Sequence, residues 1–181
     1  IFARISEAHQ ILIHEEQRKE YDRLRKSKGQ EAQEQETVRQ VLRAAGAFQK
    51  AQVLAKKNDY AAAEDAAKVA YEGDPTQAEY GAFYAWLVTQ NPNNKEKDFD
   101  TLIAILNRSV DDDPQSVPIR LYRAVVLKRA GKMNESMRDF RFVNDQQPGN
   151  VEAARELRLH KMRVEESKSN SGTLLTKLFK K

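Results

Sequence analysis

Small and apolar residues recur at helical spacing along the middle of the chain, and each series ends in a short turn that contains proline. A template of 34 residues fits the stretches that end at Pro75, Pro114 and Pro148. The fitted residues are Ala51, Leu54, Ala63, Ala67 and Ala70 in the first stretch, Phe99, Leu102, Leu106 and Ser109 in the second, and Ala124, Leu127, Gly131, Ser136 and Val143 in the third. A fixed period of this kind predicts stacked helix–turn–helix units that share one continuous core.

The prolines set the limits of three units, which we expect at 44–77, 78–116 and 117–150. Proline ends a unit because it cannot extend a helix inward and because it disfavours the helical conformation of the residue before it. Pro75 and Pro114 are 39 residues apart, whereas Pro114 and Pro148 are 34 apart. We assign the five extra residues to an enlarged turn around 91–94, inside the second unit.

The segments on either side of the repeats are more polar. Residues 1–26 carry two helical patterns, and the second places Tyr21 and Leu24 on one side of a charged helix. We expect 27–43 to form a polar helical linker, with Thr37 as the cap of the helix that follows. The pattern of 151–167 predicts a polar amphipathic helix that covers the end of the array, and 168–181 is expected to be a flexible, basic amphipathic tail.

The register of the three units resembles the tetratricopeptide repeat (TPR). The match is best in 117–150, although the Trp and Gly of the strongest form of the motif are mostly replaced. The resemblance implies an all-α fold of three TPR-type helix–turn–helix repeats. They would form a short right-handed solenoid with a C-terminal capping helix.

The first 26 residues resemble the C-terminal end of a J-domain, the DnaJ-like unit of co-chaperones. The residues that carry this resemblance are the run Ala8-His9-Gln10-Ile11-Leu12 and the pairs Gln17-Arg18 and Tyr21-Asp22. Ile13, His14 and Glu15 depart from the family's Pro-containing loop, and the family's His-Pro-Asp tripeptide does not occur in this sequence. The resemblance implies that the chain belongs to a larger co-chaperone-like protein, whose remaining J-domain would engage a DnaK-type chaperone. The alternative is a plain amphipathic helical hairpin with no chaperone link.

The charge distribution argues against nucleic acid as a partner. The 181 residues carry a net charge of +4, and from residue 161 onward six basic residues outnumber two acidic ones. The excess therefore belongs to the C-terminal segment, whereas a nucleic-acid-binding domain carries a basic stripe on its folded body. No run approaches the roughly 18 apolar residues of a membrane-spanning helix. We expect a cytoplasmic protein.

Few residues offer catalytic or metal chemistry. The chain has no Cys, and His9, His14 and His160 are not spaced as metal ligands. The run 111–113 of three Asp lies just before Pro114 and lacks the Gly and the terminal Glu of a calcium loop. We therefore expect no catalytic residues, no cofactor and no metal site, and the sequence does not predict an enzyme.

The resemblance to TPR proteins implies a concave face, lined by the first helix of each repeat, that binds a peptide or a helix. The residues at the lining positions are mostly apolar or aromatic: Phe48, Gln52, Phe83, Trp86, Leu121, Tyr122, Val125 and Lys128. Some family members hold the acidic C-terminal peptide of heat-shock chaperones with a clamp of Lys, Asn and Arg side chains. The clamp positions of this chain are Phe48, Gln52, Phe83, Pro118 and Tyr122, so we do not expect that mode of binding.

An apolar and aromatic groove suits an amphipathic helix or a hydrophobic peptide, because large rings bury much area at low entropic cost. Lys128 and Arg129 would favour an acidic flank at one end. In the alternative interpretation, Phe48, Phe83 and Trp86 only pack between repeats and bind no ligand. The predicted function is that of an adaptor or scaffold in protein–protein interaction.

The C-terminal tail offers a second set of candidate contacts. Leu174, Leu175, Leu178 and Phe179 lie at helical spacing beside Lys177, Lys180 and Lys181. These residues could dock in the groove of this chain or of a neighbour. They could instead touch an anionic membrane surface, which would make the chain a peripheral membrane-associated or assembly protein targeted by its tail. The third interpretation is a disordered terminus kept soluble by Lys.

Overall fold

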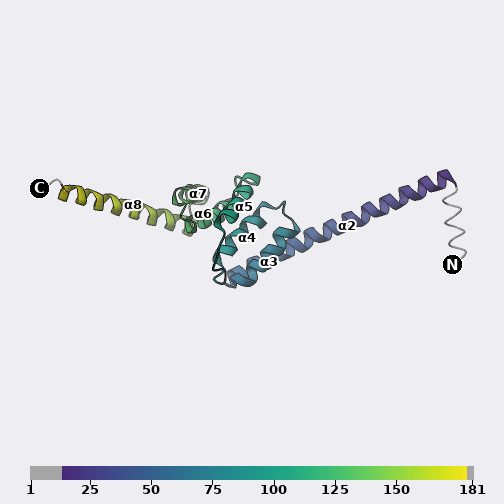
Figure 1. Cartoon of the computed structure of the whole chain (residues 1–181), viewed down its shortest axis with the longest axis horizontal. Coiled ribbons are helices and arrows are strands. Elements are labelled where there is room, and N and C mark those ends of the chain that lie inside the picture. The colour runs from purple at the N-terminus through teal and green to yellow at the C-terminus, as the bar shows by residue number, and fades with distance from the viewer. Residues whose placement is uncertain (1–13, 179–181) are drawn as a thin grey trace. The chain divides into compact units, whose positions relative to one another are not determined.

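The computed structural model describes the backbone of residues 14–178 and the side chains of 14–27 and 29–166, and the elements within that range are helices (Figure 1). Their bounds are α2 Glu15–Lys56, α3 Tyr60–Gly73, α4 Ala78–Gln90, α5 Phe99–Asp112, α6 Val117–Arg129, α7 Met133–Gln146 and α8 Val151–Leu178. The chain divides into two units, residues 1–43 and 44–181. The all-α prediction is confirmed.

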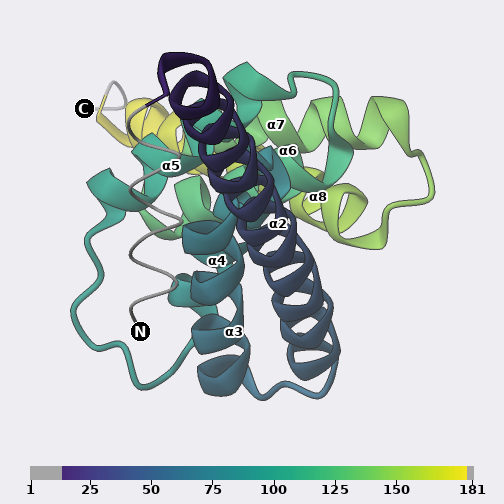
Figure 2. The ribbon, with the colours of Figure 1, turned by 90° about the vertical axis from the view of Figure 1, so that its right-hand side faces the viewer.

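In the larger unit, consecutive helices pair as three helix–turn–helix repeats. The end of α2 pairs with α3 through Ala51 and Ala63, α4 pairs with α5, and α6 pairs with α7. Helix α4 also packs against α3 and α6, so neighbouring repeats share their contacts (Figure 2). Helix α8 follows the third repeat, packs against α7 and buries Ala153 completely.

The turns inside the first and third repeats have the same local structure. Each contains one residue with positive φ, Asn58 at 61° and Gly131 at 78°, where Asn and Gly pay the smallest steric penalty. In each, the backbone N–H of the next residue reaches back into the first helix: Asp59 donates to the carbonyl of Leu54 (3.1 Å), and Lys132 to that of Leu127 (2.9 Å). The repeat seen in the sequence thus corresponds to a turn structure that recurs in the first and third repeats.

The turns between repeats are also alike, and proline explains them. The residues before the three prolines are Asp74, Asp113 and Gln147, and each adopts a φ between −146° and −135° with ψ between 80° and 84°. These angles lie outside the helical region, which a following proline disfavours. Each of these residues still donates its backbone N–H to the last turn of the preceding helix, at 2.8 to 3.0 Å.

The enlarged turn of the second repeat is held by polar contacts. Residues 91–98 join α4 to α5, and the side-chain amides of Asn91 and Asn94 both donate to the carboxylate of Glu64 in α3, at 2.7 Å. The ammonium of Lys97 donates to the carbonyl of Thr89 at 2.9 Å. Asp98 then caps α5 by accepting from the backbone N–H of Thr101 at 3.2 Å.

In the described part of the N-terminal unit, the second expected helix and the helical linker form one element with the start of the first repeat. Helix α2 runs without interruption from Glu15 through Gly29 into the first repeat. Thr37 does not cap a helix, because its hydroxyl donates to the carbonyl of Gln33 at 2.9 Å within α2. Residues 15–43 combine good helix formers with i,i+4 pairs such as Glu15–Lys19 (2.9 Å), and one Gly costs only about 1 kcal/mol in a helix.

The C-terminal helix is longer than expected. Helix α8 extends to Leu178, whereas we expected the capping helix to end near residue 167 and a flexible tail to follow. The polar stretch 167–172, which contains Ser, Asn and Gly, is typical of a flexible segment. It contains no proline, so the backbone ladder can continue through it.

A buried ion pair fixes α6 against α7. The carboxylate of Asp139 is 2% exposed and accepts from Arg123 at 2.7 and 2.8 Å and from Arg120 at 3.1 Å. Arg120 also donates to the carbonyl of Pro114, and Arg123 donates to Asn107 of α5 at 3.1 Å. One acidic side chain therefore ties α5, α6 and the turn between repeats to α7.

We expect Asp139→Asn to lower the free energy of unfolding by about 3 to 5 kcal/mol, because it removes the buried charge that pairs with two partly buried guanidinium groups. Urea denaturation followed by circular dichroism measures the change. The matched control is Asp145→Asn on the exposed face of α7, for which we expect a change below about 0.5 kcal/mol. Equal effects of the two substitutions would contradict this role of Asp139.

Candidate functional site

Six aromatic side chains from α2, α3, α4 and α6 form one connected group, which we call the aromatic cluster. Its members are Phe48, Tyr60, Tyr80, Phe83, Trp86 and Tyr122. The ring centroids lie 4.5 Å apart in Phe48–Tyr80, 5.4 Å in Phe48–Phe83, 6.3 Å in Tyr60–Trp86, 5.6 Å in Phe83–Trp86, and 5.4 Å in both Phe83–Tyr122 and Trp86–Tyr122. These are favourable ring-pair distances. Four of the eight predicted lining residues thus lie together.

The cluster is part core and part surface. Phe83 is 4% exposed and belongs to the core of the first repeat, whereas the other five rings are half-buried. Trp86 packs against the apolar cores of all three repeats. The rings that join the repeats therefore also keep part of their surface exposed. Packing between repeats does not exclude a role in ligand binding.

The other apolar lining residues lie beside the cluster. Leu121 is half-buried and packs against the core formed by α6, α7 and α8, where Val125 is 8% exposed. Gln52 is half-buried on α2, one turn after Phe48. The repeat template did not predict Tyr60 or Tyr80. Tyr60 lies at the start of a second helix, and the template places lining residues on first helices only. Tyr80 lies in the first turn of α4, a first helix, but not at a lining position.

Lys128 and Arg129 are occupied by contacts within the chain. The ammonium of Lys128 lies 2.6 Å from the carboxylate of Glu156, which is 4% exposed on α8. Arg129 donates to the carbonyl of Thr89 and, at 2.7 Å, to the side chain of Gln90. These cations therefore fasten α8 and the end of α4, and we no longer expect them to select an acidic flank.

The pairing with Lys128 keeps the carboxyl of Glu156 ionised. Burial raises the pKa of its carboxyl, but the hydrogen bonds and charges of Lys128 and Arg155 outweigh burial and leave the pKa below its ordinary value. The ionised form is therefore the one that stabilises the junction between α6 and α8.

The end of the aromatic cluster opposite Lys128 and Arg129 is acidic, which we did not predict from the sequence. Glu79 is half-buried in the first turn of α4 and precedes Phe83 and Trp86 by four and seven residues, so all three share one stripe of the helix. Burial raises the pKa of the Glu79 carboxyl, and the like charge of Asp113 raises it further. Burial also raises the pKa of the Tyr122 hydroxyl, with Glu79 as the second cause. The sequence signal was available, as an acid four residues before a predicted lining residue.

The candidate tail contacts are described only in part. The backbone of Leu174, Leu175 and Leu178 is helical, as the end of α8, and their side chains lie outside the described residues, as does the whole of Phe179. The J-domain-like run 8–12 also lies outside them. Gln17, Arg18, Tyr21 and Asp22 stand on the exposed first turns of α2.

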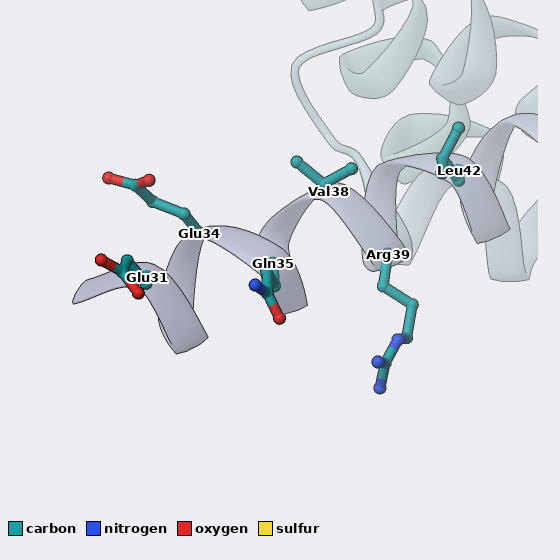
Figure 3. Close-up of a pocket in the computed structure, with 6 residues that line it drawn as sticks. All are labelled: Glu31, Glu34, Gln35, Val38, Arg39 and Leu42. Carbon is teal, nitrogen blue, oxygen red and sulfur yellow. The ribbon is translucent and has the colours of Figure 1, made fainter. Parts of the chain in front are cut away.

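A hollow on α2 is a weaker candidate site. Its lining residues are Glu31, Glu34, Gln35, Val38, Arg39 and Leu42, and Figure 3 shows that all six project from this one helix. Val38 is 58% exposed and Leu42 is 68% exposed. A site that only one helix lines encloses no ligand.

Two further kinds of site are not found in the part of the chain that the structure describes. No group of three or more His, Cys, Asp or Glu side chains there could hold a metal ion. None of the described helices has a stretch apolar enough and long enough to cross a membrane.

Comparison with known proteins establishes the fold. The first TPR of Spaghetti (RPAP3), bound to an HSP90 peptide, is similar with a TM-score of 0.57 and 19% identity, over 69% of this chain and 98% of that one. The second TPR domain of human RPAP3, in complex with an HSP70 peptide, gives 0.53 and 19% over 69% and 98%. The Arabidopsis OM64 TPR domain gives 0.55 and 16% over 66% and 94%. No family model and no curated protein matches the sequence. The chain therefore has the all-α TPR solenoid fold.

We expect Glu156→Gln to lower the free energy of unfolding at pH 7 by about 1 to 3 kcal/mol, because it removes a buried charged hydrogen-bond partner. The folded-state pKa lies below the ordinary value of about 4.3, so the contribution is present above that pH and is lost as the pH falls through the folded value. Urea denaturation at pH 7 and at about pH 3 tests this, with exposed Glu152→Gln as the control. A loss that stays the same at both pH values would contradict the pairing.

Proposed function

We propose that this chain is a non-enzymatic adaptor for protein–protein interaction, and that the aromatic cluster is the surface that captures a peptide or helix of its partner. The observation that carries the proposal is the half-buried state of five of the six rings in a TPR-type solenoid. Large rings contribute much of the binding energy at protein interfaces because they bury area without ordering many torsions. Gln52, Leu121 and Val125 would border the bound segment.

The partner should present apolar side chains. The similar TPR domains of RPAP3 bind peptides of HSP90 and HSP70, which supports a peptide as the ligand class. Those two peptides end in the acidic sequence EEVD. In this chain Phe48, Gln52, Phe83, Pro118 and Tyr122 stand at the positions of the cationic clamp, and Lys128 pairs with Glu156. We therefore propose an amphipathic helix with an apolar face as the ligand.

We further propose that the adaptor belongs to a larger J-domain co-chaperone-like protein. The support is the resemblance of 1–26, of which Gln17, Arg18, Tyr21 and Asp22 lie in the described range. In that protein the rest of the J-domain would recruit a DnaK-type chaperone, and the aromatic cluster would bring in the client or partner.

The chain's own C-terminal segment supplies a probe of the proposed chemistry. A labelled peptide of residues 171–181 carries Leu174, Leu175, Leu178 and Phe179, and its fluorescence anisotropy reports binding to the full chain. We expect saturable binding that Phe48→Ala weakens by about tenfold, through the loss of one large ring. The control is Val53→Ala, which truncates an exposed apolar residue of the same helix. Equal affinities of the two variants, with both folded by circular dichroism, would overturn the assignment of the surface.

A further inference from the structure

We propose that the aromatic cluster selects a cationic side chain, a Lys or Arg of the bound helix, and that Glu79 is the residue that recognises it. This inference rests on the proposed function and adds the charge of the partner to it. The residues that would receive the cation are Glu79, Tyr80, Phe83, Trp86 and Tyr122.

The first support is the position of Glu79. Its side chain begins the stripe of α4 that continues with Phe83 and Trp86, which lie against Tyr122 of α6 at 5.4 Å. The charge of Glu79 also contributes to the raised pKa of both Tyr80 and Tyr122. Glu79 therefore belongs to the face of α4 that carries the half-buried Trp86 and the buried Phe83.

The second support is that Glu79 has no counter-charge among the side chains that the structure describes. No hydrogen bond or ion pair joins it to another side chain among the residues whose side chains the structure describes. Three cations of α6, the helix that carries Tyr122, are engaged elsewhere: Arg120 and Arg123 bind Asp139, and Lys128 binds Glu156. Its charged neighbour is Asp113, a second acid. A half-buried carboxylate beside another acid is costly, and a ligand cation would offset that cost.

The third support is the match between the rings and a Lys or Arg side chain. An ammonium or guanidinium group is attracted to the face of an aromatic ring, most strongly to Trp and Tyr. The aliphatic stem of either side chain can lie along apolar surface while its charged head reaches a carboxylate. The half-buried Tyr80, Trp86 and Tyr122 offer such ring surface beside Glu79. A bound helix that carries a Lys or Arg next to an apolar residue would therefore contact both the rings and Glu79.

The charge preference is opposite to that of the similar domains. The peptides bound by the TPR domains of RPAP3 are SRMEEVD and SGPTIEEVD, both of which carry acidic residues at their C-termini. In this chain the free charge beside the rings is negative. The same fold would then hold a basic segment where its structural neighbours hold an acidic one.

The test compares two peptides and three forms of the full chain. One peptide has the sequence of residues 171–181, with three Lys, and the other replaces each Lys by Gln. We expect the unmodified chain to bind the Lys peptide about tenfold more tightly, a ratio that corresponds to about 1.4 kcal/mol. Glu79→Gln should remove this preference while it keeps the affinity for the Gln peptide. Glu72→Gln, an exposed acid of α3, should keep the preference.

Each outcome decides the proposal. Equal binding of both peptides by the unmodified chain, or a preference that survives in Glu79→Gln, overturns the role of Glu79 and leaves the proposed function standing. Failure of the unmodified chain to bind either peptide overturns the proposed function itself. Circular dichroism checks that Glu79→Gln is folded, and we expect no loss of stability because the substitution removes a charge without a partner.

Discussion

The packing of α4 is the constraint on which the rest of the structure depends. This helix touches α3, α5 and α6 directly and meets α2 through its rings, so no residue of α4 is exposed. Close approach requires small residues, and Gly81 shows the limit: an added Cβ would lie 3.0 Å from the ring of Tyr71 and 3.2 Å from Ile105. The three repeats are joined because α4, a helix of the second repeat, also packs against α3 of the first and α6 of the third, and its Trp86 contacts the cores of all three.

The same constraint produces the candidate site. Of the rings at the junction of the repeats, Phe83 is buried, whereas Phe48, Trp86 and Tyr122 are only half-buried. The proposed binding and the stability of the fold therefore depend on the same side chains. Truncating Phe83 removes a core residue, which costs about 3 to 5 kcal/mol in typical cores, and such a variant cannot separate the two roles. The more exposed Phe48 and the charged Glu79 are better placed to do so.

The repeats were predictable from the sequence because their determinants are local. Proline restricts the backbone conformation of the residue before it. Asn58 and Gly131 adopt the positive φ that their turns require. The same register predicted four rings of the aromatic cluster as lining residues. The continuity of α2 and the length of α8 did not follow, since polar residues and a single Gly weaken a helical pattern without breaking a helix. Nor did the engagement of Lys128 by Glu156, 28 residues away, because the partners of surface charges depend on how helices pack.

Trp86 is the only Trp of the chain, so its fluorescence tests the central claim, that the junction of the repeats is also the surface that holds the ligand. The measurement is iodide quenching of the full chain with and without a saturating peptide of residues 171–181. The account predicts partial quenching of the free protein, because the indole is half-buried, and clear protection when the peptide is bound. Unchanged quenching in the presence of bound peptide would contradict it, because the peptide would then lie elsewhere.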